Sequence, residues 1–139
     1  QALDLENLML FIIKNKPKYI GIDSPNGLNK GYMDDEKYRE KINLKSNYHY
    51  NKKVSEYYLS TMGFKLYNTP KTLEALGTFK EWMTAGFQLF NKLEKIGYPS
   101  INEINVNTLK QGTVEVFPHA SFGILKGFIF PSKSNRLFF

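Results

Sequence analysis

Residues Val114–Phe122 read VEVFPHASF, and this stretch decides the fold class of the chain. Its β-branched and aromatic residues predict a strand over Val114–Phe117, which Pro118 ends. Glu115 is a carboxylate inside that apolar run, and burying it in a sheet is costly unless something pairs with it. The residues that follow, Ala120–Leu125, predict a short helix. The stretch therefore indicates a strand that passes directly into a helix.

A second short apolar run, Tyr19–Ile22, predicts another buried strand, and an acid and a proline follow it, Asp23 and Pro25. Ligands of open α/β sheets bind at the carboxyl ends of the strands, where Asp23 and Glu115 fall. Two carboxylates brought together there could hold one or two divalent cations, which polarise a phosphate and activate water. A structural alternative stays open, in which Asp23 caps a turn and Glu115 pairs with a lysine or arginine.

Cysteine is absent from the 139 residues, which excludes disulfides and cysteine-bound metal. The remaining metal ligands are mostly hard oxygens, which favour magnesium, manganese or calcium over zinc. No apolar run is long enough to cross a membrane, and no signal-peptide pattern is present. We therefore expect a cytoplasmic protein that has no membrane partner.

Several helices are predicted in the first half of the chain. Apolar residues at helical spacing predict a helix over residues 3–14, with Asp4 as its N-cap. Residues 34–42 predict one or two helical turns. A further short helix is expected from Ser55, as its cap, to Met62, and Gly63 suits the position after its end.

The longest helical pattern covers residues 70–97 and carries a stripe of phenylalanine, leucine and methionine that predicts a buried face. Gly77 indicates a break, because Thr78 and Glu81 stand at capping-box spacing directly after it. The order helix, strand, long helices, strand, helix predicts an α/β layered domain. Two strands do not make a stable sheet, so either further strands are hidden or the chain is part of a larger domain.

The formal charge of +6 suits a polyanionic partner such as nucleic acid. Only two of the nineteen basic residues are arginine, however, so a lysine-rich composition explains the charge equally well. Residues 26–54 predict an excursion from the sheet that could be mobile. In and beside it, tyrosines alternate with lysines in a pattern that suits stacking on single-stranded bases or, alternatively, ordinary packing. These residues are Tyr48, Tyr50, Tyr57, Tyr58, Lys45, Lys52 and Lys53.

Other side chains are candidates for contacts with a substrate. His119 could act as a general base or a phosphate contact, and it could equally cap a helix. Arg39 and Arg136 could clamp phosphate or carboxylate, with Lys133 nearby in sequence, although single arginines more often form surface ion pairs.

An ordered set of short motifs runs through nearly the whole chain, from about Leu5 to Arg136. Its members are Ile22-Asp23-Ser24-Pro25, Arg39, Gly63, Tyr67-Asn68-Thr69-Pro70, Trp82-Met83, Gly86, Leu89, Leu93, Gly97, the run from Glu115 to Phe122, Leu125, Gly127 and Lys133. The set resembles domain-of-unknown-function family 429, whose members are predicted to be RNase H-like nucleases. No single motif is decisive, and the ordered set is much more specific than any part.

The resemblance implies an RNase H-like layered domain, with a central sheet flanked by helices, over residues 1–139. The family's opening Gly-x-Asp strand and its late Asp-Ala-x-Asp-Ala-like helix have no counterpart in this sequence, so we expect the chain to be the middle of such a domain. Asp23 and Glu115 would be catalytic and metal-binding, and His119 a third catalytic group. By the resemblance, His119, Lys133 and Arg136 would also be nearby polar support for the two acids. We take Ser24, Arg39, Lys133 and Arg136 as the candidate substrate contacts.

The leading hypothesis is therefore a nuclease or phosphodiesterase that uses Mg²⁺ or Mn²⁺ and acts on nucleic acid. Because only two of the family's acids are present, it is open whether this chain is active alone. The alternative is a non-catalytic module of the same fold that binds nucleic acid or nucleotides. An enzyme for small phosphate compounds, or an interaction protein, could also use this scaffold. The substrate and the oligomeric state do not follow from the sequence.

Overall fold

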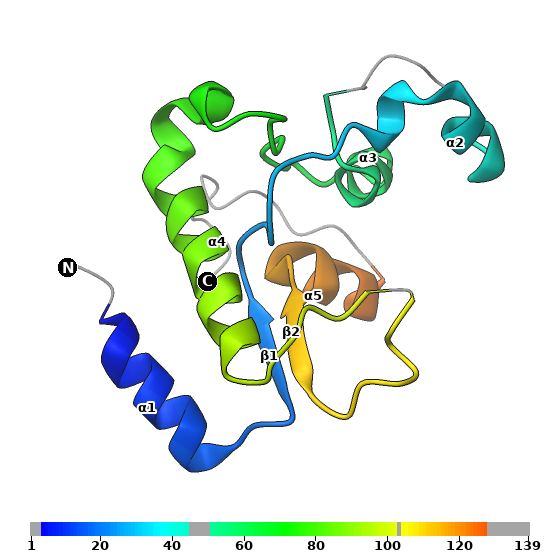
Figure 1. Cartoon of the computed structure of the whole chain (residues 1–139). Coiled ribbons are helices and arrows are strands. Elements are labelled where there is room, and N and C mark those ends of the chain that lie inside the picture. The colour runs from blue at the N-terminus through cyan, green and yellow to red at the C-terminus, as the bar shows by residue number, and fades with distance from the viewer. Residues whose placement is uncertain (1–3, 45–50, 103, 128–139) are drawn as a thin grey trace, which may run out of the picture. The chain divides into compact units, whose positions relative to one another are not determined.

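The computed structural model describes residues 4–44, 51–102 and 104–127, and it combines helices with a small parallel sheet (Figure 1). The chain is thus a mixed α/β protein, as the sequence predicts at that level. In order, its elements are α1 (Leu5–Asn15), β1 (Tyr19–Ile22), the 3₁₀-helix η1 (Tyr32–Asp34), α2 (Glu36–Lys41), α3 (Val54–Thr61), the 3₁₀-helix η2 (Glu74–Phe79), α4 (Lys80–Lys95), β2 (Gly112–Glu115) and α5 (Pro118–Lys126).

Two compact units interleave along the sequence. The first comprises the described parts of Gln1–Asn26 and Phe79–Val116, and it carries α1, β1, α4 and β2. The second comprises the described parts of Gly27–Thr78 and Phe117–Phe139, and it carries η1, α2, α3 and α5. One RNase H-like domain over the whole chain stays a prediction. The described part of the predicted excursion, residues 26–44 and 51–54, contains η1 and α2, and its expected mobility also stays a prediction.

The sheet of the first unit pairs β1 and β2 in parallel, and Ile22 lies opposite Glu115. The predicted second strand is displaced, because β2 ends at Glu115 and not at Phe117. Two backbone preferences explain the displacement. Thr113 is fully buried and exchanges backbone hydrogen bonds with the segment around Ser100, which extends pairing toward the N-terminal side. Phe117 is already the N-cap of α5, with Pro118 in the first turn, so it cannot continue the ladder.

The core of the first unit lies between α1, α4 and the sheet. Its buried cluster consists of Ile12, Ile22, Phe90, Leu93 and Tyr98. The predicted helix is confirmed for α1, and the Asp4 carboxylate accepts a hydrogen bond of 3.1 Å from the Asn7 amide, as an N-cap does. The buried face is narrower than its apolar pattern, since Ile13 is 51% exposed.

The break in the long helical pattern is confirmed at Gly77, whose φ of +54° interrupts η2 ahead of α4. The predicted capping box is wrong, because α4 begins after Phe79 and no side chain caps it. The dihedral angle of Gly77 is the physical reason. A residue in the left-handed region moves the helix start beyond Thr78, so Thr78 is not at the cap position.

The second unit is held by a buried carboxylate. One Glu56 oxygen accepts hydrogen bonds from the backbone amide of Thr69, at 3.0 Å, and from the Thr69 hydroxyl. The other oxygen accepts a hydrogen bond from the Lys53 amide at 2.9 Å, and Lys53 is the N-cap of α3, which begins at Val54. The prediction that Ser55 caps this helix is wrong, because Ser55 lies inside it. Glu56 is only 7% exposed, and burying a carboxylate is costly unless donors compensate its charge. Here the two backbone amides and the Thr69 hydroxyl are those donors.

This arrangement predicts that Thr69→Val destabilises the protein. The variant keeps the side-chain volume and the Thr69 amide but removes the hydroxyl that donates to the buried carboxylate. Hydrogen bonds to charged groups contribute about 1.5–3 kcal/mol, so the free energy of unfolding should fall by roughly that amount in urea titrations. Thr108→Val, at an exposed threonine, is the control and should change it by less than about 0.5 kcal/mol. Equal midpoints for the two variants would contradict the role of Glu56.

Candidate functional site

The two predicted acids lie at the same edge of the sheet. Because β1 and β2 run in parallel with Ile22 opposite Glu115, both strands end together (Figure 1). Glu115 is the last residue of β2, and Asp23 directly follows β1. This edge, where ligands of open α/β sheets bind, thus carries one carboxylate from each strand.

Glu115 is tied to the loop that follows β1. Its Oε2 atom accepts a hydrogen bond of 3.0 Å from the backbone amide of Asn26. Since Glu115 is half-buried, this charge-assisted bond compensates part of the cost of placing a carboxylate at the end of a strand. The same bond directs the Glu115 carboxylate toward the loop that begins at Asp23.

Asp23 is exposed, and the chain bends at Asp23 and Ser24. Alternation along a strand would place Asp23 and Glu115 on opposite faces, because Ile22 and Glu115 are register partners. The strand ends at Ile22, however, so this alternation does not extend to Asp23. Because Asp23 is exposed, solvent reaches it at the end of β1.

Ser24 is buried beneath α4. A Cβ atom built at Gly86 would lie 1.8 Å from Ser24 Oγ, so the helix approaches the loop at a distance that only glycine permits. Glycine inside a helix costs about 1 kcal/mol relative to alanine, and its presence in the middle of α4 was the sequence signal for this close approach. The assignment of Ser24 to substrate binding stays a prediction.

The second unit contains the other described candidates. The Arg39 guanidinium donates a hydrogen bond of 2.8 Å to the Met33 carbonyl, which ties α2 to η1. His119 is the second residue of α5, and its half-buried ring makes edge contacts with Phe64 and Phe117, at centroid distances of 5.9 and 6.1 Å. Their roles toward a substrate stay predictions. Lys133 and Arg136 lie outside the described residues.

The tyrosine and lysine pattern is only partly within the described residues, which omit Lys45, Tyr48 and Tyr50. Tyr57 is buried, and the Tyr58 hydroxyl donates to the Ile42 carbonyl at 3.1 Å. These contacts are those of packing residues. Stacking on bases by this stretch stays a prediction.

The described residues offer only a few side chains that could bind a divalent cation. Within residues 4–44, 51–102 and 104–127, no group of three or more histidine, cysteine, aspartate or glutamate side chains could hold a metal. Mg²⁺ is commonly held by one or two carboxylates, with waters and substrate phosphates as the other ligands. Asp23 and Glu115 supply that number of carboxylates at one end of the sheet.

The close approach of α4 predicts that Gly86→Ala destabilises the protein by about 1–3 kcal/mol, the usual cost of overpacking. Ser24→Gly removes both atoms that the new Cβ would meet within 3 Å, so the double variant should recover much of the loss. Gly27→Ala is the control, because a Cβ there meets nothing within 4 Å. Thermal unfolding of the parent, the two single variants, the double variant and the control would measure these effects. If the losses of stability from Gly86→Ala and Ser24→Gly simply add in the double variant, the contact is contradicted.

A family model described as "Protein of unknown function (DUF429)" matches residues 5–136, which is nearly the whole chain. No curated protein and no solved structure matches. Among the described residues, no helix is both long and apolar enough to span a membrane.

Proposed function

We propose that this chain, which belongs to the DUF429 family of unknown function, forms the carboxylate site of a metal-dependent phosphodiesterase that cleaves nucleic acid. The fold we propose for the complete domain is RNase H-like, with the parallel pair β1 and β2 in its central sheet. The observation that carries the proposal is that β1 and β2 end side by side, with an acid at the end of each strand. Register pairing of Ile22 with Glu115 brings Glu115 and the residue after Ile22, Asp23, to one end of the sheet.

The two acids have different surroundings, which suit different tasks. Glu115 is oriented by the Asn26 amide, so its carboxylate is positioned before a ligand arrives. Asp23 is exposed and follows a bend, so it can adjust to a cation and to a phosphate. Asp23 and Glu115 would hold Mg²⁺ or Mn²⁺. When bound, such an ion polarises the phosphate and lowers the pKa of a water molecule.

Further groups from the sequence analysis belong to the same proposal. His119 is the candidate for proton transfer, and Arg39, Lys133 and Arg136 are candidates for phosphate contacts. The net charge of +6 favours association with a polyanion in the same way.

The test is cleavage of labelled DNA and RNA by the complete protein in Mg²⁺, in Mn²⁺ and in a chelator. Asp23→Asn and Glu115→Gln should each reduce metal-dependent cleavage by more than about 100-fold, because even outer partners of a bound metal contribute 10–100-fold. Glu94→Gln is the control, since it changes an exposed glutamate on α4 in the same way.

Glu115→Gln also separates charge from folding. Its amide oxygen can still accept the Asn26 hydrogen bond, so the unfolding temperature should stay close to that of the parent protein. Glu115→Ala removes the acceptor as well and should lower it. Cleavage by Asp23→Asn at the parental rate would rule out the proposed site.

The second candidate function is a module that binds nucleic acid without cleaving it. It is favoured by the small number of acids, since the described residues offer two carboxylates at the sheet edge and no cluster of three. This alternative predicts binding that weakens steeply as salt rises and no turnover with any divalent metal. The metal-dependent assay above distinguishes the two functions directly.

A further inference from the structure

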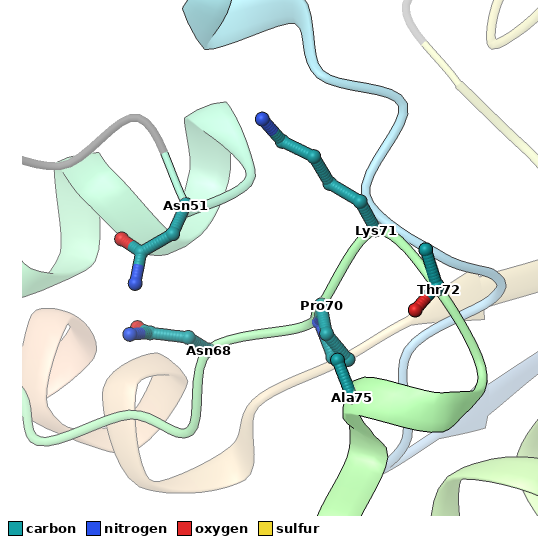
Figure 2. Close-up of a pocket in the computed structure, with 6 residues that line it drawn as sticks. All are labelled: Asn51, Asn68, Pro70, Lys71, Thr72 and Ala75. Carbon is teal, nitrogen blue, oxygen red and sulfur yellow. The ribbon is translucent and has the colours of Figure 1, made fainter.

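The second unit contains an open pocket of about 430 Å³, which Figure 2 shows in close-up. Sites for small ligands usually measure about 300–1,000 Å³, and this volume lies in the lower part of that range. Five of the six lining residues are exposed and the sixth, Pro70, is half-buried, so a ligand of nucleoside size would lie in a shallow site that is open to solvent. Two carboxamides, one ammonium, one hydroxyl and two apolar side chains line it. The lining residues are Asn51, Asn68, Pro70, Lys71, Thr72 and Ala75.

The segment Asn68–Thr72 supplies most of the lining, and hydrogen bonds to Thr69 and Pro70 hold it in place. Glu56 binds both the amide and the hydroxyl of Thr69. The Pro70 carbonyl accepts a hydrogen bond of 2.9 Å from the Asn29 amide. These bonds hold Thr69 and Pro70 in place, so the backbone of this segment needs little ordering when a ligand binds.

The charge of the pocket is balanced. The Lys71 ammonium pairs with the Asp34 carboxylate, and both side chains are about half exposed. No other lining side chain is charged. A phosphate would therefore compete with Asp34 for Lys71, whereas a neutral polar group would leave the ion pair intact. The electrostatics favour a neutral ligand with donors and acceptors.

The two carboxamides supply the complementary polar edge. Figure 2 shows the ends of Asn51 and Asn68 pointing toward one another on one side of the pocket. A carboxamide offers an acceptor and two donors, and this pattern pairs in two places with the N6 and N7 edge of adenine. Pro70 and Ala75 add apolar surface on which the face of a ring can rest.

From this combination we infer that the pocket binds a nucleobase, with adenine as the best match. The base could belong to a free nucleoside or to a nucleic-acid strand, and its chemistry is the same in both. Only the second case rests on the proposed function, in which the pocket would hold a base of the strand that is cleaved. Binding itself requires neither a metal nor Asp23.

Titration of the ¹⁵N-labelled complete protein with adenosine, uridine and inorganic phosphate tests the inference. Adenosine should bind more tightly than uridine, and its affinity should be unchanged between low and high salt because the ligand is neutral. Asn51→Ala and Asn68→Ala should each weaken adenosine binding by about tenfold or more, the value of a good pair of hydrogen bonds to a base. Asn91→Ala, at an exposed asparagine on α4, should leave it unchanged.

Two further measurements complete the test. An adenine octanucleotide that binds at least tenfold more tightly than adenosine identifies a strand as the source, and equal affinity identifies a nucleoside. Asp23→Asn that retains adenosine binding, in a protein without nuclease activity, leaves the pocket standing while the proposed function fails. Adenosine affinity that is equal in the parent and both asparagine variants, or phosphate binding without adenosine binding, overturns the inference.

Discussion

The parallel pairing of β1 with β2, in the register that sets Ile22 opposite Glu115, is the constraint on which the first unit depends. The two strands are far apart in sequence, and a shift of one residue would turn Glu115 to the other face of the sheet. Burial of Ile22 in the cluster with Ile12 and Phe90 holds β1 in place. The fully buried Thr113, bonded to the Ser100 segment, does the same for β2. The position of the acids is thus a consequence of packing.

Each unit contains a glutamate that accepts a hydrogen bond from a backbone amide in another segment, Glu56 from Thr69 and Glu115 from Asn26, with different results. Glu56 is buried, and its two oxygens bind the amides of Thr69 and Lys53, so it is committed to structure. Glu115 is half-buried, and its Oε2 atom binds the Asn26 amide at the edge of a sheet. A carboxylate that is held but not fully enclosed can also serve a ligand, which is the physical difference between a fold determinant and a candidate site.

Local patterns in the sequence were sufficient for the elements, and less so for their ends. The Asp4 cap and the Gly77 break follow from short-range chemistry, and the structure confirms both. The predicted end of the second strand, Phe117, lies two residues beyond the actual end of β2 at Glu115, because an apolar run does not reveal that Phe117 already caps a helix. The burial of Ser24 under Gly86 and the clamp of Glu56 on Thr69 needed contacts between distant segments, which periodicity does not report.

The proposed cation site and the proposed base pocket require different electrostatics, and the two places on the chain differ in how their charges are compensated. Cation binding needs carboxylates that solvent and ligands can still reach, and Glu115 is only half-buried while its Oε2 atom accepts a hydrogen bond from the Asn26 amide. Recognition of a neutral base needs polar groups without net charge, and the pairing of Lys71 with Asp34 removes the charge that would otherwise attract phosphate. The net charge of +6 favours a polyanionic partner for the chain as a whole, but it does not select the ligand at either place. What selects a ligand in each place is how far the local charges are compensated.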